Sequence, residues 1–179
     1  MRLPAELRNT IYYYALGGVT WLVRGDQGGT CTNDGTNHAH ALLGVNRQIH
    51  SEASLFPYIH NTFQGRHDGH LKCWVESLPV HYREVLTSVK LHQRGYIVQG
   101  AEGMEVSPTF WMAIPNTSSW GLDGLKRIEI EVVLFSWRWD CSEDMVNEAR
   151  NRVLARLREL IEEQHPGIQL LITYLKCKY

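Results

Sequence analysis

The order of apolar patterns in the last third of the sequence constrains the fold most strongly. Residues 125–132 alternate between apolar and charged side chains, which is typical of a half-buried β-strand. Residues 142–163 carry an apolar stripe at helical spacing, formed by Val146, Ala149, Val153, Leu157 and Leu160. A further apolar run at 168–174 predicts another strand. A strand, a long helix and a strand in succession favour parallel pairing with a covering helix.

The preceding residues extend this alternation of strands and helices. Residues 87–92 have the pattern of a half-buried strand, and residues 110–114 are predicted to form a helical turn after it. A shorter helix is predicted at 70–77. We expect 87–92, 125–133 and 168–174 to be neighbouring strands of one sheet. The predicted fold class is α/β (or α+β), with an N-terminal helical pair and a small β element, then a β-α-β-α-β sheet with covering helices.

The N-terminal residues have the pattern of an amphipathic helix followed by a strand. Residues 4–16 show helical spacing, and the glycines at 17 and 18 supply the stop. The β-prone stretch 19–24 follows. Residues 25–38 are rich in Gly, Asn, Asp and Thr, which predicts a loop or loose hairpin.

A second helix and a short strand complete the first third of the chain. Residues 41–56 show helical spacing, and Pro57 is predicted to end that helix. Residues 61–63 predict a short strand. We divide the chain into an N-terminal segment, 1–65, and an α/β segment, 66–179, and expect the two to pack as one domain.

The composition is that of an ordinary globular domain, with 44% hydrophobic and 21% charged residues. The net charge of −1 argues against nucleic acid as a partner, because phosphate binding usually requires a basic excess. No apolar run approaches the roughly 20 residues of a membrane helix, and the N-terminus shows no secretory core. We therefore expect no membrane association and a cytoplasmic or nuclear location.

Cysteine and histidine positions give weak metal signals. The four cysteines include no CxxC pair, which predicts reduced thiols. The candidate ligands are the closely spaced His67, His70 and Cys73, with Cys31, His38 and His40 on a separate loop. Zinc needs four convergent nitrogen or sulfur ligands, and nothing in the sequence joins the two groups. We expect no metal and no other cofactor.

Catalytic signatures are also missing from the sequence. It contains no GxSxG, P-loop, GxGxxG or HExxH motif. We therefore predict a protein-binding module with no catalytic residues. A metal-assisted or cysteine-dependent enzyme, with Cys31 and a nearby histidine as a nucleophile pair, is the alternative.

Two segments near the N-terminus carry a family resemblance. Residues 3–12 read LPAELRNTIY, and residues 42–53 read LLGVNRQIHSEA, followed by Tyr58, Asn61 and Phe63. Together they resemble a fungal F-box-like family of unknown function, whose members open with an LPxE[IL]RxxIY helix and continue with LLxxxRQxxxEA and NxF motifs. The same pair also resembles the F-box itself.

The F-box resemblance implies a partner and a binding face. It implies that Leu3, Pro4, Leu7 and Ile11 contact the Skp adaptor of cullin ubiquitin ligases, in a subunit that recruits substrates. Two interpretations of this stripe stay open. We expect it to pack on the rest of the domain, with 17–40 and 41–56 covering it, because an amphipathic helix needs a core before it needs a partner. The alternative is an exposed stripe that a partner covers.

Tryptophans and charged residues provide further candidates. Trp137 and Trp139 lie on one side of an extended segment, where they either join the core or form a partner-binding surface with the intervening arginine.

Charged residues on the two N-terminal helices are Glu6, Arg8, Arg47 and Glu52. We expect them to form salt bridges that tie these helices together, and a charged recognition site is the alternative.

Overall fold

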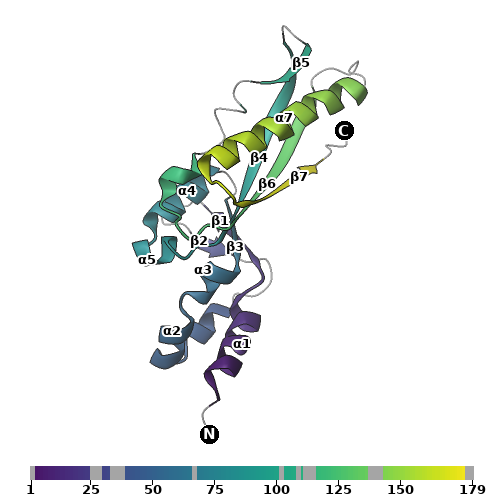
Figure 1. Cartoon of the computed structure of the whole chain (residues 1–179). Coiled ribbons are helices and arrows are strands. Elements are labelled where there is room, and N and C mark those ends of the chain that lie inside the picture. Colours follow the sequence, from purple (N-terminus) through teal and green to yellow (C-terminus); the bar gives the residue numbers. More distant parts are fainter. Residues whose placement is uncertain are drawn as a thin grey trace.

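The fold is seen in a computed structural model of the chain. It describes residues 3–24, 30–32, 39–65, 68–100, 103–107, 110, 116–136 and 143–175. Helices and a mixed sheet form an elongated molecule, in which N-terminal helices extend from one end of the sheet (Figure 1). The predicted α/β class is confirmed.

Within the described residues, the sheet has seven strands in the order β2-β1-β3-β4-β6-β7, with β5 paired to β4. Five strands are parallel: β1 (Thr20–Arg24), β3 (Thr62–Gly65), β4 (Ser88–Gly100), β6 (Arg127–Ser136) and β7 (Gln169–Leu175). The antiparallel strands are β2 (Thr30–Thr32) and β5 (Gly103–Val106). Because β4, β6 and β7 are adjacent and parallel, the prediction of three neighbouring strands is confirmed.

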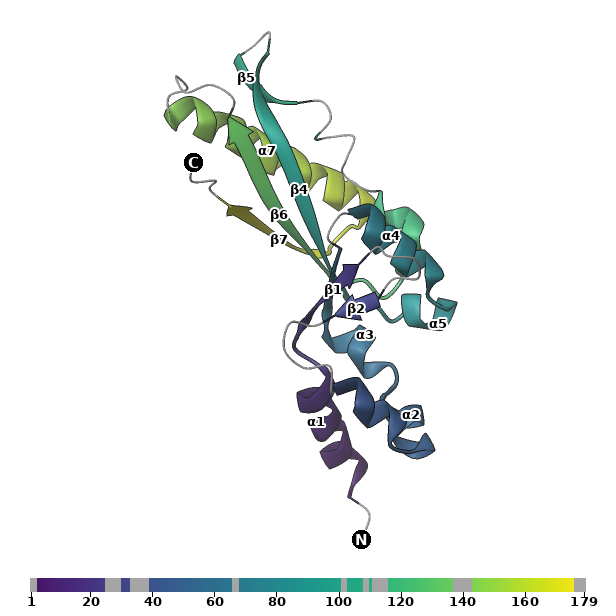
Figure 2. The same cartoon turned by 180° about the vertical axis from the view of Figure 1, so that it is seen from behind.

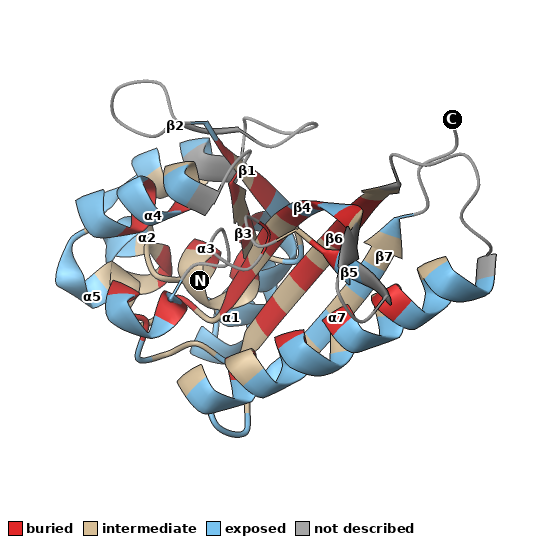
Figure 3. Ribbon diagram, turned by 90° about the horizontal axis from the view of Figure 1, so that it is seen from above, coloured by how far each residue is buried: buried red, intermediate tan, exposed pale blue. Residues whose placement is uncertain are grey.

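One face of the sheet is covered by the long helix α7 (Glu143–Gln164). Its buried residues are Ala149, Val153, Leu157 and Ile161, which form one core with the inward side chains of β4 and β6. Figure 3 shows this layer of buried residues between α7 and the strands. The predicted helix at 142–163 is confirmed, and it ends where the His165-Pro166-Gly167 sequence begins.

Shorter helices cover the rest of that core. The helix α4 (Asp68–Ser77) buries Leu71, Trp74 and Val75 and confirms the helix predicted at 70–77. It is followed by α5 (Val80–Arg83), which was not predicted, and later by the 3-10 helix η2 (Thr117–Trp120). Phe110 is buried in the core, and the rest of the helical turn predicted at 110–114 lies outside the described residues.

The N-terminal helices differ from the prediction in one respect. The helix α1 (Ala5–Leu16) is confirmed, but the single helix predicted at 41–56 is wrong. It is three short elements: η1 (Ala39–Gly44), α2 (Arg47–Ala53) and α3 (Phe56–His60). Asn46 interrupts the pattern as an N-cap, since its side chain accepts a hydrogen bond from the Ile49 amide at 2.8 Å. Pro57 lies in the first turn of α3 instead of ending a helix.

The sheet joins the two sequence segments into one architecture. Strands β1 and β3 come from residues 1–65 and pair with β4 from 66–179. Asn61, which is only 3% exposed, fastens α1 to this sheet. Its side-chain nitrogen donates to the Leu16 carbonyl at 2.6 Å, and its oxygen accepts from the Val19 amide at 3.0 Å. The helical end is thereby anchored at the start of β1 and β3.

Among the described residues, no helix covers the second face of the sheet along β4, β6 and β7 (Figure 2). Its charged side chains pair with one another, both between strands β4 and β6 and along β6 itself. Lys90 Nζ lies 2.7 Å from Glu131 Oε2, and Arg127 Nη2 lies 2.8 Å from Glu129 Oε1. The Lys90 ammonium holds the pKa of Glu131 below its usual value. These charged side chains are satisfied by one another, which explains why this part of the face can stay in contact with solvent.

In the described part of the chain, none of the helices combines the length and the apolar character that crossing a membrane requires.

Candidate functional site

Helix α1 packs through a face that the sequence pattern did not single out. Tyr12 and Leu16 are 4% and 2% exposed and meet the fully buried Ala53 of α2. These residues form a small core of their own, closed by half-buried side chains at Leu42, Leu43, Ile49 and Phe56. The helix is thus held by one face only.

An ion pair on the same face fixes the rotation of α1. Arg8 donates to both oxygens of Glu52, from Nε to Oε2 at 2.8 Å and from Nη2 to Oε1 at 3.0 Å. Tyr12 donates its hydroxyl hydrogen to Glu52 at 3.0 Å, and Gln48 donates to it at 2.9 Å. Arg8 also donates to the Leu3 carbonyl at 2.6 Å. Bidentate pairs have strict geometry, so this network determines which side of α1 faces α2.

The network confirms one predicted salt bridge between the N-terminal helices, Arg8 with Glu52. Glu6 and Arg47 are exposed and take no part in that pair. The Arg8 guanidinium, followed by the Gln48 amide, lowers the pKa of Glu52 to about 2. Glu52 is therefore ionised throughout the neutral and mildly acidic range.

Replacing Glu52 with glutamine should lower stability near neutral pH and have progressively less effect in acid. A carboxyl group with a folded pKa of about 2 stabilises the fold fully above its unfolded pKa of roughly 4.3, and this contribution is lost as the pH falls toward 2. Melting temperatures of wild type and Glu52→Gln, measured between about pH 7 and pH 2.5, should therefore converge below about pH 4. A gap that stays constant over this range would contradict the ion-pair assignment.

The opposite face of α1 leaves its apolar stripe in solvent. Leu3, Leu7 and Ile11 are 52%, 52% and 48% exposed, Tyr14 is 80% exposed, and Pro4 is also exposed. Because a helix turns about 100° per residue, this stripe lies roughly opposite the buried Tyr12 face. The expectation that this stripe packs on the rest of the domain is wrong. The face of α1 that carries Arg8, Tyr12 and Leu16 packs there instead. We call Leu3, Pro4, Leu7, Ile11 and Tyr14 the α1 stripe.

The other residues predicted to bind a partner cannot be placed. Trp137 and Trp139 lie outside the residues that the structure describes. The α1 stripe therefore contains all the described members of the predicted site. Leu7 and Ile11 lie on one face of α1, and Leu3 and Pro4 directly precede the helix.

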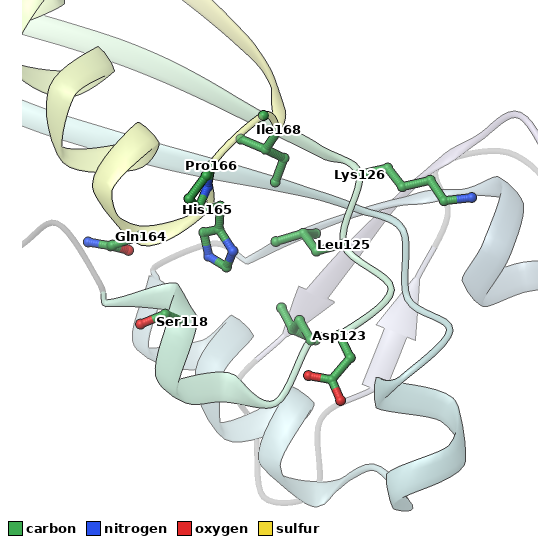
Figure 4. Close-up of a pocket in the computed structure, with 10 residues that line it drawn as sticks. Ser118, Asp123, Leu125, Lys126, Gln164, His165, Pro166 and Ile168 are labelled. Atoms are coloured by element: carbon green, nitrogen blue, oxygen red, sulfur yellow. The ribbon is translucent and has the colours of Figure 1, made fainter.

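A cavity of about 490 Å³ is the second candidate site (Figure 4). Its lining comes from the connection before β6 and from the turn between α7 and β7: Ser118, Leu122, Asp123, Leu125, Lys126, Gln164, His165, Pro166, Gly167 and Ile168. In Figure 4, the Lys126 side chain points away from the ring of His165. The lining thus combines apolar side chains, such as those of Leu122, Leu125 and Ile168, with separated polar groups.

A buried polar network forms one wall of this cavity. Thr117 is fully buried, and its amide and hydroxyl donate to Gln164 Oε1 at 3.1 and 3.2 Å. Its hydroxyl also lies 2.9 Å from His165 Nε2. Burial lowers the pKa of His165, so the ring is neutral near neutral pH. This network joins η2 to the end of α7, and sequence spacing could not reveal it because its members are 47 residues apart.

The cavity lies at the amino ends of β6 and β7, because its residues immediately precede those strands. In open α/β sheets, ligands usually bind outside the carboxyl ends of the strands. The position of the cavity therefore differs from that of a typical α/β active site.

The candidate metal ligands are only partly visible. Cys73 is exposed on α4 and His70 is half-buried on the same helix, while His67 and His38 lie outside the described residues. Cys31 and His40 lie in β2 and η1, and the structure does not describe their side chains. Among the described residues, no group of three or more His, Cys, Asp or Glu side chains is placed to hold a metal ion.

Comparison of the chain with protein-family models, curated proteins and solved structures gives no match. The case for a functional site therefore rests on the geometry of α1 and on its sequence motif.

Proposed function

We propose that this protein is a protein-binding module whose α1 stripe docks on the Skp adaptor of cullin ubiquitin ligases. In this role the chain is an F-box-like, substrate-recruiting subunit that acts in the cytosol or nucleus. No catalytic step is assigned to it. The remainder of the chain, including the sheet, would present the surface that selects the substrate.

The exposure of Leu7 and Ile11 carries this proposal. A surface leucine alone needs no explanation, but apolar side chains in a contiguous row usually mark an interaction site. Leu7, Ile11 and Tyr14 follow one another on one helix face and remain about half exposed or more. Such a row fits the helix-in-groove mode, in which apolar anchors spaced by three or four residues enter a partner's groove.

The buried face of α1 prepares this surface for binding. The Arg8–Glu52 pair and the small core around Tyr12 fix the helix before any partner arrives. A rigid helix loses little conformational entropy on association, which favours affinity. The sequence Leu3-Pro4-Ala5-Glu6-Leu7, which resembles the F-box motif, is exposed along its whole length.

The placement of the cavity supports a binding role over the alternative of an enzyme. It lies at the amino ends of the strands, and its His165 is engaged by the buried Thr117. The histidine therefore has a structural role, because its contact with Thr117 joins the α7–β7 turn to η2. A cysteine-dependent or metal-assisted enzyme remains the second candidate. Elemental analysis of the purified chain tests the metal-assisted alternative.

Co-expression with the Skp adaptor tests the proposal. We expect the full chain to co-elute with the adaptor at a one-to-one ratio in size-exclusion chromatography. A variant with Val80→Glu serves as the control, because Val80 is 57% exposed on α5 and is not part of the α1 stripe. It should bind as wild type does. An adaptor that elutes separately from the wild-type chain would reject the ubiquitin-ligase role.

A further inference from the structure

We propose that the cavity beside the α7–β7 turn binds a basic side chain of a peptide, with the aliphatic stem on the apolar lining and the cationic end beside Asp123. The α1 stripe lies elsewhere, on the N-terminal helices at one end of the molecule (Figure 1). The test of this site involves no adaptor, so its outcome is separate from that of the proposed function.

The buried Thr117 determines which nitrogen of the His165 ring is an acceptor. The Thr117 hydroxyl has one hydrogen, which it donates to Gln164 Oε1 at 3.2 Å. Its oxygen therefore accepts from His165 Nε2, which is 2.9 Å away. A neutral imidazole carries a hydrogen on only one nitrogen, so Nδ1 of this ring keeps a lone pair. The ring that lines the cavity thus offers an acceptor to a ligand.

Two further side chains of the lining also offer acceptors. Ser118 donates its hydroxyl hydrogen to Asn116 Oδ1 at 2.5 Å, which leaves the lone pairs of the Ser118 oxygen for other donors. Asp123 is exposed at the cavity, and within the described residues its carboxylate forms no hydrogen bond or ion pair. A carboxylate only accepts hydrogen bonds. A positively charged ligand that donates hydrogen bonds therefore fits these groups.

The backbone amides of the α7–β7 turn are already engaged. The amide of Gly167 donates to Glu162 Oε1 at 3.0 Å, and that of Ile168 donates to the His165 carbonyl at 3.2 Å. The Gln164 side chain supplies one neutral amide nitrogen as a donor. This turn therefore offers little to an anionic ligand.

The ammonium of Lys126 faces another part of the molecule. Figure 4 shows the Lys126 side chain pointing away from the ring of His165. Burial, followed by the charge of Lys126, lowers the pKa of His60, so this ammonium acts on α3. The structure shows no ion pair between Lys126 and Asp123, both of which are described. The negative charge of Asp123 is therefore left for a ligand.

The apolar part of the lining suits the stem of a lysine or arginine side chain. Leu122 is 6% exposed, and Leu125 and Ile168 are half-buried. Basic side chains commonly lay their methylene groups on apolar surface and keep the charged end in water. The volume of about 490 Å³ lies within the range of small-ligand pockets, roughly 300–1,000 Å³. The cavity can therefore hold one such side chain together with its backbone.

Titration with two blocked amino acids tests the requirement for charge. Nα-acetyl-arginine N-methylamide carries a guanidinium, and the corresponding citrulline compound has nearly the same shape without the charge. We expect the arginine compound to shift the amide NMR signals of the full chain around His165 and Ile168. It should bind at least about 10-fold more tightly than the citrulline compound. Equal affinities, or no shift with either compound at about 20 mM, would overturn the proposal.

Charge-removing variants test the location of the site. Asp123→Asn should weaken binding of the arginine compound by about 5-fold or more and leave the fold intact, because the side chain is exposed. Asp144→Asn is the matched control, since it removes the same charge from an exposed position at the other end of α7 and should bind as wild type does. An equal loss in both variants would show attraction to net charge only. Tighter binding of Nα-acetyl-glutamate N-methylamide would give the cavity to an anion at Lys126. Either result would overturn the proposal.

Nitrogen NMR of the histidine rings provides an independent readout of the acceptor. We expect the hydrogen of His165 on Nε2 at neutral pH, with Nδ1 unprotonated. A hydrogen on Nδ1 would turn this acceptor into a donor and contradict the match with a basic side chain.

Discussion

Replacing Leu7 with glutamate should weaken binding of the Skp adaptor by about 100-fold or more and leave the melting temperature within about 2 °C of the wild type. Leu7 is 52% exposed in the middle of the α1 stripe, so the change removes no buried contact. Glutamate is a good helix former, and its charge is favourable near a helix N-terminus. At a desolvated interface, however, the same carboxylate would be buried without a partner.

Leu16→Glu is the matched control for this experiment, since it is the same substitution on the same helix. Leu16 is 2% exposed, so burying a carboxylate there should cost several kcal/mol and lower the melting temperature clearly. Isothermal titration calorimetry and thermal unfolding of both variants separate binding from folding. If Leu7→Glu unfolded the chain or left the affinity unchanged, the α1 stripe would not be a binding surface.

Replacing Gly124 with alanine should lower the free energy of unfolding by about 3 kcal/mol, although the change adds only one methyl group. A β-carbon at position 124 would overlap the carbonyl oxygen of Glu84 and press on the backbone of Val85. Neither neighbour is a flexible side-chain end, so the connection before β6 would have to move. For a chain of this size, that loss corresponds to a melting temperature roughly 6–12 °C lower.

Gly69→Ala provides the control for Gly124→Ala. Gly69 lies in α4, and a β-carbon added there would meet nothing within 4 Å. Alanine is favoured over glycine in a helix by about 0.5–1 kcal/mol, so this variant should be neutral or slightly more stable. Thermal unfolding of the two variants side by side measures the contrast. Equal melting temperatures would show that the backbone around Gly124 adapts without cost.

Local patterns were sufficient to predict the central sheet. The alternation in β4 and β6 and the long stripe of α7 each specify an element and the face that it buries. The order of these elements then favours parallel neighbours. The hairpin partner β5 was missed, because its four residues, Gly103–Val106, are recognised only through their register with β4.

The orientation of α1 could not be obtained from periodicity. Leu7 and Ile11 suggest one buried face, whereas Arg8, Tyr12 and Leu16 form a second face with the same four-residue spacing. Propensity alone does not decide between them. The deciding contact is with Glu52, which is 44 residues away from Arg8.

The break in the second predicted helix has a local cause that was visible in the sequence. Asn46 is a strong N-cap residue. Its side-chain oxygen accepts a hydrogen bond from the amide of Ile49, three residues later. The apolar residues on both sides of Asn46 keep helical spacing, which favours one continuous helix despite this cap. The cavity wall depends instead on Thr117, Gln164 and His165, and the sequence does not indicate that these residues meet.

Hydrogen–deuterium exchange of the full chain, with and without the Skp adaptor, tests the central claim most directly. The claim is that the exposed face of α1 is the partner-binding surface. We predict that amide exchange in Ala5–Leu16 slows by about 10-fold or more on binding, while exchange in β7 is unchanged. Unchanged exchange in α1 with protection elsewhere, or no complex at all, would contradict the account.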